Sequence, residues 1–355
     1  MSSLEAQCSR RLSNHRYRAP AEVLSALATD PAAAEPMDLY GAGGAATRLE
    51  QRTAELLGKP AAMFFIKGMI AQMSVLRSAA EQARTLNVAI HPMSHVDLDE
   101  AGAAWRIHNL RPIRLGRYSP FTVADLEGIT EPLAAIVVEL PLRRSGYLLP
   151  PLDELRAISA WARERSIHLH FDGARIWEAA AGYGVHLAEL SALADSVYVS
   201  FYKGLGGLGG AIVAGDAPFI RSLAIWKTRH GGNLYRLFPY TISALAGLDS
   251  HLPRMPEYVD RARKLAELLG SEPGLAVTPQ LPAVNAFHLL IPGSVEALEE
   301  RNREFARQRD VWLFNNFLES PVDGRSIGEV VMGDSSDNYE LEEAAGWIRA
   351  FLNLA

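Results

Sequence analysis

Short apolar runs alternate with amphipathic segments along most of the chain. Residues 134–140, 168–171 and 197–202 are apolar and β-branched or aromatic, with no regular polar alternation, which is typical of strands buried on both faces of a parallel sheet. The segments between them, such as residues 151–164, carry the periodicity of helices. This order predicts an α/β fold with a mostly parallel central sheet flanked by helices.

The same pattern divides the chain into three parts. Residues 1–37 form an arm with a short helix over 21–29, interrupted by prolines, and such arms often lie on a partner subunit. Residues 38–250 hold the βα units and form the large domain. Prolines and charges become denser around 253–256, so we place a boundary near 250. Residues 251–355 are expected to form a smaller α+β domain, in which helices over 294–310 and 340–354 pack on a small sheet.

Lys203 stands at the carboxyl end of the buried run 197–202 and is followed by glycines. In open α/β sheets this edge is where ligands bind. A desolvated lysine there has its ammonium pKa lowered toward the neutral amine that condenses with a carbonyl. A surface lysine that closes a strand is the commoner case, so other residues must decide.

The glycines after Lys203 allow another interpretation. Gly204, Gly206 and Gly209 satisfy the dinucleotide-binding pattern G-x-G-x-x-G, which requires a helix directly after the glycines. Residues 211–214 instead begin a second apolar strand. A nicotinamide dehydrogenase is therefore the weakest of the functions considered.

Asp172 ends another apolar strand, with Arg175 three residues later. An aspartate before a helix is often only its N-cap. However, 31 residues separate Asp172 from Lys203, which is the length of one βαβ unit, so both side chains should emerge at the same sheet edge. A carboxylate and an amine that converge there fit pyridoxal 5'-phosphate, because its ring nitrogen pairs with an Asp and its aldehyde with a Lys.

Two further positions are candidates for the same site. Gly68 follows a short strand over 61–66 and begins a helix, and backbone N–H groups at such a junction can hold an anion. His95 follows a strand over 87–90 and precedes a helical segment predicted over 100–104. A lone histidine is more often structural than catalytic.

Composition excludes several classes of function. The chain of 355 residues has a formal net charge of −6, which offers no basic surface for nucleic acid or an anionic membrane. Cys8 is the single cysteine, so no intramolecular disulfide can form. The amino terminus lacks the apolar core of a secretory signal, and no run of about 18 apolar residues is present. We expect a cytoplasmic protein that acts on a small molecule and has no metal site.

Several stretches together resemble a known family. They are DLYGAGGAATRLEQRTAELLGK from Asp38, SHVDLDEAGA around His95, LPPLDELRAISAWARERSIHLHFDGARIWEAAAGYGV through Asp172, and DSVYVSFYKGLGG through Lys203. The chain resembles the low-specificity L-threonine aldolase branch of the β-eliminating lyases, which are fold-type I pyridoxal-phosphate enzymes. The resemblance runs from about residue 38 to 215.

The resemblance implies roles for individual residues. Lys203 would bind the cofactor aldehyde, Asp172 would pair with the pyridine nitrogen, and His95 would stack on the ring. Arg175 would contact the cofactor's phenolic oxygen or the substrate carboxylate, and Arg325 would be a second carboxylate ligand. The family forms homodimers or tetramers that share sites, to which Tyr40 and Arg236 would contribute.

The chain departs from the family pattern at the phosphate and substrate positions. Lys67, Gly68 and Met69 replace Ser-Gly-Thr at the phosphate position, which removes two hydroxyls and adds a cation. Tyr202 replaces the usual serine before the lysine. Leu140 and Leu142 lie where the family has polar groups, so we expect a dry pocket that favours bulky apolar β-substituents.

Three functions follow from these residues. The first is a lyase of amino acid metabolism that cleaves the Cα–Cβ bond of a β-hydroxy-α-amino acid to glycine and an aldehyde. The second is a related β-eliminating lyase, racemase or aminotransferase. The third, motivated by the lost hydroxyls, is a cofactor-binding protein without turnover.

Overall fold

A computed structural model describes residues 4–353 of the chain. Residues 1–3 of the predicted arm and Leu354, the last residue of the predicted C-terminal helix, lie outside this range. The chain forms two compact units, one of residues 26–253 and one in which the residues up to 25 join those from 254 onward. Within the described range, no helix is both long and apolar enough to span a membrane.

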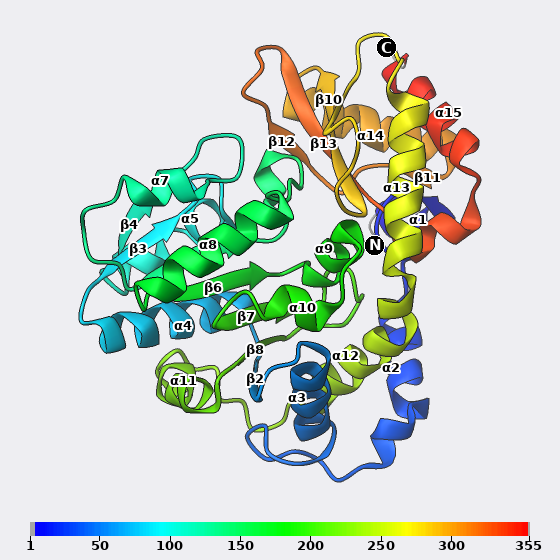
Figure 1. The fold of residues 1–355 in the computed structure, drawn as a ribbon. Coiled ribbons are helices and arrows are strands. Elements are labelled where there is room, and N and C mark those ends of the chain that lie inside the picture. The colour runs from blue at the N-terminus through cyan, green and yellow to red at the C-terminus, as the bar shows by residue number, and fades with distance from the viewer. Residues whose placement is uncertain (1–3, 354–355) are drawn as a thin grey trace. The chain divides into compact units, whose positions relative to one another are not determined.

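The larger unit is built on a seven-stranded sheet (Figure 1). Its strands in chain order are β2 (Ala61–Phe65), β3 (Asn87–Ile90), β4 (Arg111–Arg114), β5 (Ala135–Glu139), β6 (His168–Gly173), β7 (Ser196–Ser200) and β8 (Ala211–Gly215). Their order in space is β2-β8-β7-β6-β5-β3-β4. The strands from β4 to β7 are parallel, whereas β8 pairs antiparallel with both β7 and β2. The predicted α/β fold with a mostly parallel sheet is confirmed.

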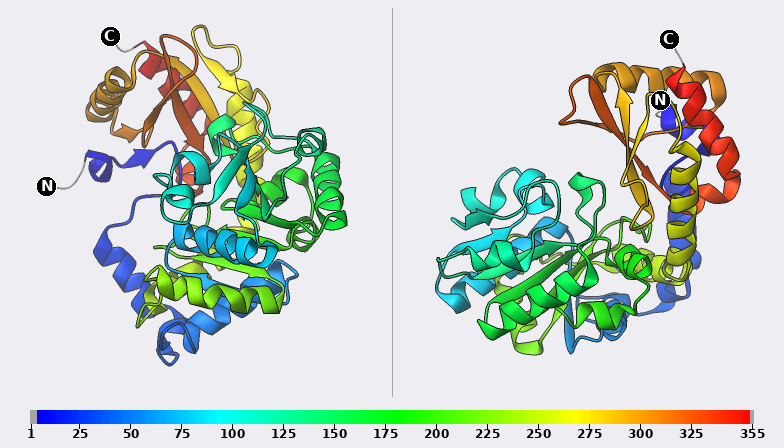
Figure 2. Two further views of the ribbon diagram at one scale, coloured as in Figure 1. Left: turned by 90° about the vertical axis from the view of Figure 1, so that its left-hand side faces the viewer. Right: turned by 45° about the horizontal axis from the view of Figure 1, so that its top comes forward.

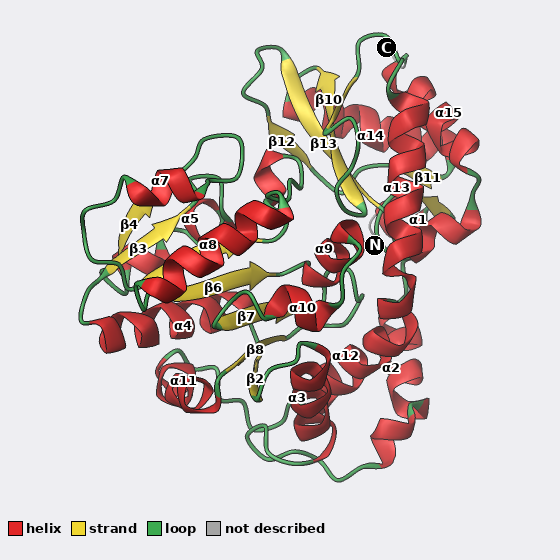
Figure 3. Ribbon diagram, viewed as in Figure 1, coloured by secondary structure: helices red, strands yellow, loops and turns green. Residues whose placement is uncertain are grey.

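Helices connect and cover these strands, as the colouring in Figure 3 shows. The longer ones are α3 (Gly44–Leu56), α4 (Gly68–Ala83), α8 (Leu152–Glu164), α9 (Ile176–Tyr183), α11 (Ala217–Arg229) and α12 (Phe238–Ser250), whereas the residues of α2 (Pro20–Thr29) belong partly to each unit. The shorter ones are α5 (His95–Leu98), α6 (Ala103–Arg106), α7 (Val123–Glu127) and α10 (Leu187–Ser191). Figure 1 shows α4 and α8 on opposite sides of β6.

The packing of α4 on the sheet identifies the strand residues that share its side of the sheet. Its apolar side joins Phe65, Tyr198, Val213 and Leu223 in one buried cluster. Because side chains alternate along a strand, residues two apart share a face. The face of β7 that carries Tyr198 therefore also carries Ser196 and Ser200.

The smaller unit contains an antiparallel sheet in the order β12-β13-β10-β9. Its strands are β9 (Ala276–Thr278), β10 (Ala286–Pro292), β12 (Phe317–Glu319) and β13 (Arg325–Val331). The helices of this unit are α1 (Leu4–Gln7), α13 (Met255–Leu269), α14 (Val295–Arg309) and α15 (Leu341–Leu352). Figure 2 shows two further views of these elements.

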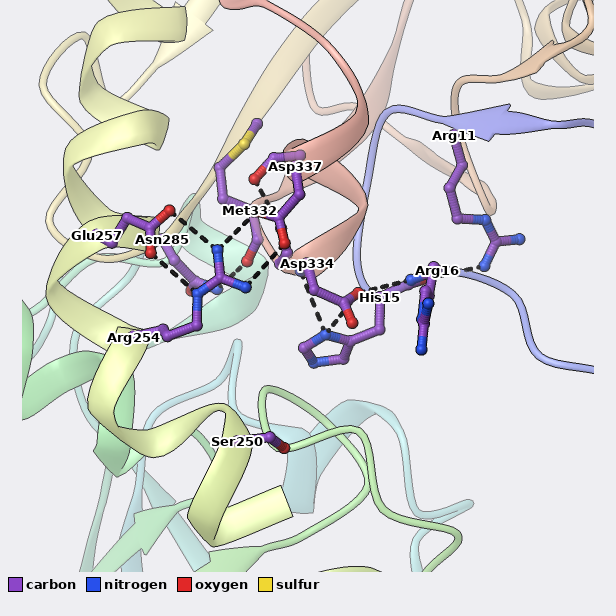
Figure 4. A network of polar contacts seen from close by, with 12 residues as sticks. Arg11, His15, Arg16, Ser250, Arg254, Glu257, Asn285, Met332, Asp334 and Asp337 are labelled. Carbon is purple, nitrogen blue, oxygen red and sulfur yellow. Dashed lines mark hydrogen bonds and ion pairs between the residues drawn. The ribbon is translucent and has the colours of Figure 1, made fainter. Parts of the chain in front are cut away.

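The amino-terminal segment is integrated into this smaller unit. Its strand β1 (Arg10–Arg11) pairs parallel with β11 (Val311–Trp312). The backbone N–H of Arg16 donates to Asp334 at 2.7 Å, close to Arg254, which forms ion pairs with Glu257 and Asp337 (Figure 4). The small unit thus joins residues that lie more than 300 positions apart in the sequence. Local periodicity does not indicate such pairings.

Candidate active site

A cavity opens at the carboxyl ends of the central strands in the larger unit. Its empty volume is about 500 Å³, including solvent at its mouth. The side chains that line it come from the start of α4, the segment around α5, the end of β6, and β7 with the turn that follows: Lys67, Gly68, Met69, Gln72, His95, Asp99, Glu100, Asp172, Tyr198, Tyr202 and Lys203. The structure therefore brings seven of the residues singled out from the sequence into one cavity.

Lys203 lies in the turn after β7, because the strand ends at Ser200, earlier than predicted. The turn is held by hydrogen bonds from Gly207 N to Phe201 O at 2.8 Å and from Gly206 N to Lys203 O at 3.0 Å. Burial lowers the pKa of the Lys203 amine to about 8, and the nearby positive charge of Arg175 acts in the same direction. The amine is thus more readily neutral than an ordinary lysine.

Asp172 is buried at the end of β6, in register with Tyr198 of the adjacent parallel strand. One carboxylate oxygen accepts a hydrogen bond from Ala174 N at 3.3 Å. Helix α9 begins only at Ile176, and its N-cap position is occupied by Arg175. Asp172 is therefore not the cap of that helix, and its carboxylate lines the cavity together with Lys203.

His95 opens the short helix α5 and presents its ring to the cavity. The segment 100–104 was predicted to be helical, but Glu100 lies in the turn between α5 and α6. Its side chain is only 2% exposed and approaches His95 Nδ1 at 3.2 Å, whereas His95 is 37% exposed. The hydrogen bond to Glu100 raises the pKa of His95, and burial raises the pKa of Glu100.

Glu139 ends β5 beside Asp172 in the parallel register. It accepts hydrogen bonds from His95 N at 2.7 Å and from Arg143 N at 3.1 Å. Burial, followed by the negative charge of Asp172, raises the pKa of Glu139 to about 7. This carboxyl therefore anchors the backbone of the segment that carries His95.

The junction at Gly68 forms the wall of the cavity at the start of α4. Lys67 is the N-cap residue of this helix, and no side chain caps its first N–H groups. A Cβ atom at position 68 would overlap the hydroxyl oxygen of Tyr198, so glycine is required for this close approach. The predicted anion junction thus opens into the cavity that contains Lys203.

The other predicted site residues lie outside the cavity lining. Arg175 stacks over the Tyr147 ring at 5.1 Å and affects Lys203 only through its charge. Arg325 begins β13 in the smaller unit, and its guanidinium donates to the backbone carbonyls of Gly274 at 2.8 Å and Leu290 at 3.1 Å.

Tyr40 and Arg236 form a separate cluster. Tyr40 is exposed and packs edge-on against Tyr235, with ring centroids 5.4 Å apart. Arg236 lies over the same Tyr235 ring at 4.3 Å and donates a hydrogen bond to the backbone carbonyl of Asp38. Neither lines the cavity of its own chain, and their contribution to a partner's site stays a prediction.

The prediction about Leu140 and Leu142 is wrong in its premise. Both side chains are buried, and neither lines the cavity. Leu142 instead faces a smaller hollow with His91, Phe121 and Val138. These leucines fill the core beyond β5, so they provide no basis for a preference for apolar substrates.

Sequence reasoning missed several cavity residues, namely Gln72, Asp99, Glu100 and Tyr198. Tyr198 lies within an apolar strand and resembles a core residue, and Gln72 lies inside a helix. Only the acidic pair after His95 carried a local signal, since buried carboxylates near a histidine often tune its pKa. The others became site residues through the packing of α4 on β7.

Comparison with known proteins places this geometry in a family. A family model described as beta-eliminating lyase matches residues 26–289. A low-specificity L-threonine aldolase from Candida albicans is 29% identical over 231 residues, which cover 62% of this chain and 61% of that protein. The chain thus spans less than two thirds of this relative's length.

Two solved structures match nearly the whole chain. One, from Listeria monocytogenes, is provisionally described as an L-allo-threonine aldolase. It has a TM-score of 0.91 and 32% identity, and the match covers 99% of this chain and 98% of that one. The other, from Exiguobacterium, is provisionally described as an aromatic amino acid beta-eliminating lyase/threonine aldolase, with a TM-score of 0.91, 32% identity and coverage of 98% and 99%.

Proposed function

The chain belongs to the beta-eliminating lyase family, and on this premise we propose that it is a pyridoxal-phosphate-dependent lyase that cleaves the Cα–Cβ bond of a β-hydroxy-α-amino acid to glycine and an aldehyde. The observation that carries the proposal is the single cavity shared by Lys203, Asp172 and His95. These supply an amine, a carboxylate and a titratable ring, which are the groups this chemistry requires.

The cavity residues fit the cofactor. Lys203 offers an amine with a lowered pKa for the aldehyde, and Asp172 offers a buried carboxylate for the ring nitrogen. At the start of α4, uncapped N–H groups and Lys67 favour the phosphate. Once bound, pyridoxal phosphate supplies an electron sink for a bond broken at Cα.

His95 is the group that removes the proton from the substrate's β-hydroxyl. Its ring is accessible from the cavity, and Glu100 holds it through Nδ1. Its backbone N–H is bound by Glu139, which limits movement of the segment. Arg175 keeps a positive charge close to Lys203, where it disfavours protonation of the amine.

The functional unit is proposed to be a homodimer or a tetramer of dimers. Met37, Leu39, Tyr40, Tyr235 and Phe238 form an exposed apolar surface around the loop that holds Asp38. Asp38 itself is buried and accepts hydrogen bonds from Leu237 N and Phe238 N, both at 2.9 Å, so the two loops are rigidly joined. A second copy that covers this surface would bring Tyr40 and Arg236 to its neighbour's site.

Three measurements test the proposal. Borohydride reduction followed by peptide mapping should find the pyridoxyl group on Lys203, and finding it on Lys67 would contradict the assignment. Threonine and phenylserine should each release glycine. If neither does, while alanine, serine or cysteine is racemised or deaminated, the chain is a different member of the family. An active monomer in sedimentation would refute shared sites.

A further inference from the structure

Gln72 lines the cavity and combines burial with an unpartnered side-chain donor. It is the fifth residue of α4 and is 2% exposed. Its Oε1 lies 2.8 Å from His170 Nε2. Its Nε2 atom has no hydrogen-bond partner among residues 4–353, although the residue lines the cavity. A buried amide donor without a partner costs free energy unless a ligand satisfies it.

The partner of Gln72 belongs to a longer buried chain of hydrogen bonds across β6 and β7. His170 Nδ1 lies 2.7 Å from Ser196 Oγ, and the same oxygen lies 2.7 Å from His168 Nε2. Burial lowers the pKa of His170 to about 3 and that of His168 to about 4. Both rings are therefore neutral near pH 7, so each carries one proton.

The direction of the chain follows from the orientation of the Gln72 amide. Because Gln72 Oε1 can only accept, the neutral His170 carries its proton on Nε2 and donates it to Gln72. Nδ1 of His170 then accepts from the serine hydroxyl, and His168 donates to the serine oxygen. Every bond then runs toward the cavity, and the Gln72 Nε2–H₂ group remains as the terminal donor.

Other donors converge on the same part of the cavity. The buried Tyr198 hydroxyl abuts Gly68, and the uncapped start of α4 follows Lys67. At this junction, Lys67 and Met69 replace the hydroxyl-bearing residues that the family resemblance leads one to expect. The site is therefore rich in donors and lacks the usual ones.

We propose that Gln72 anchors the cofactor's phosphate, donating from Nε2 to a phosphate oxygen in place of the missing hydroxyls, and that His170 and Ser196 are positioning residues that keep the amide in this orientation. The inference rests on the proposed function. It assigns to this chain a phosphate contact that depends on a buried relay of neutral hydrogen bonds.

The test compares two ligands that differ only in the phosphate. The affinity of the apo-protein for pyridoxal 5'-phosphate and for pyridoxal is measured by equilibrium dialysis, for the wild type and for Gln72→Met and Gln72→Glu. Gln72→Met keeps the volume and removes the donor. This substitution should lower the affinity for pyridoxal phosphate by about tenfold or more and should change the affinity for pyridoxal little. Gln72→Glu should lower the affinity for pyridoxal phosphate further, because a carboxylate repels phosphate.

Matched controls separate these effects from general damage. Ser78→Ala changes a buried position of the same helix that is bonded to Ser222, so it should leave both affinities unchanged. Ser196→Ala should selectively weaken the affinity for pyridoxal phosphate. Ser200→Ala should not, because the Ser200 hydroxyl is buried on the same strand and has no hydrogen-bond partner within the described part of the chain. Thermal unfolding shows that each variant is folded.

The outcomes distinguish the inference from its premise. If the wild type does not take up the cofactor on Lys203, both the proposed function and the inference fail. If it does, the Gln72 variants decide the inference. Only the inference is overturned if these variants bind pyridoxal phosphate with wild-type affinity, or if they lose affinity for both ligands equally. If Gln72→Met behaves as expected while Ser196→Ala equals the wild type, the positioning role is overturned and the phosphate contact stands.

Discussion

Two histidine–glutamate pairs among the described residues lie in different settings. In the larger unit, His95 and Glu100 lie 3.2 Å apart, with exposed fractions of 37% and 2%. In the smaller unit, His288 and Glu329 are register partners on β10 and β13, 3.4 Å apart, with exposed fractions of 3% and 9%. The pairing is similar, but His95 lines the cavity that contains Lys203, whereas His288 is buried between strands.

The two pairs therefore differ in how accessible the histidine ring is and much less in the distance between histidine and glutamate. A base must reach the proton that it removes, and a ring enclosed between two strands has no such path. The buried pair can contribute to the stability of the small sheet, whereas the exposed ring can act on a ligand while its buried partner tunes it. The following predictions test this distinction, from the largest expected effect to the smallest.

Replacing the two histidines should give opposite results. His95→Asn removes the base, so kcat should fall by about 10² to 10⁴-fold, with little change in the melting temperature. His288→Asn removes the partner of a buried carboxylate, so it should lower the free energy of unfolding by about 1 to 3 kcal/mol and leave kcat unchanged. Steady-state kinetics and denaturant unfolding of both variants check this. Equal losses of kcat would remove the distinction.

Asp172 extends the comparison to a buried carboxylate that does line the cavity. Asp172→Asn should keep the bound cofactor and its colour, because the phosphate and Lys203 still hold it. Turnover should fall by about 10² to 10³-fold, because the charge that stabilises the protonated ring nitrogen is lost. Absorption spectra and kcat are the measurements. A near-native kcat would show that Asp172 has only a structural role.

The two glutamates should differ in their effect on the pH profile. Glu100 raises the pKa of His95, whose neutral form is the base, so activity falls as pH drops through this raised pKa. Glu100→Gln removes the main cause of the shift, and the acid limb of the kcat/KM profile should move to lower pH. Glu329→Gln should leave the limb in place. An unchanged limb in Glu100→Gln would mean that another group controls it.

Arg175 should have the smallest effect, because it acts on Lys203 only through its charge. The lowered pKa of about 8 means that the rate of cofactor uptake by the apo-protein should rise as pH increases through this value. Arg175→Gln removes a charge that lowers the pKa, so the midpoint should shift upward. Arg175→Lys keeps the charge and is the control. Uptake is followed by stopped-flow absorbance, and identical midpoints for Gln and Lys would exclude the charge effect.

Much of the fold could be predicted because its signals are local. The apolar runs gave β5, β6 and β7, and helical periodicity located α8, α14 and α15 within a few residues. The antiparallel direction of β8 was not expected, since a strand that follows a glycine turn can pair in either direction. The membership of β1 in the smaller unit depends on pairing with β11, which no local pattern encodes.

The residues of the candidate site also differ in whether a local signal in the sequence identifies them. Lys203 and Asp172 could be found because they end consecutive buried strands, and strand ends are visible in a sequence. Leu140 and Leu142 were misassigned because neighbours along the chain need not face the same cavity. Arg325 donates to two backbone carbonyls of its own unit, and its role as a carboxylate ligand stays a prediction.

The sequence by itself determined the order of the βα units, the strand ends that carry Lys203 and Asp172, and the glycine that begins α4. These depend on periodicity and backbone propensity, which are properties of neighbouring residues. Only the tertiary structure decided that Gln72 meets His170, 98 positions away, and that Tyr198 reaches Gly68. Such contacts arise when α4 packs on β6 and β7, because burial then forces distant polar groups to find each other or a ligand.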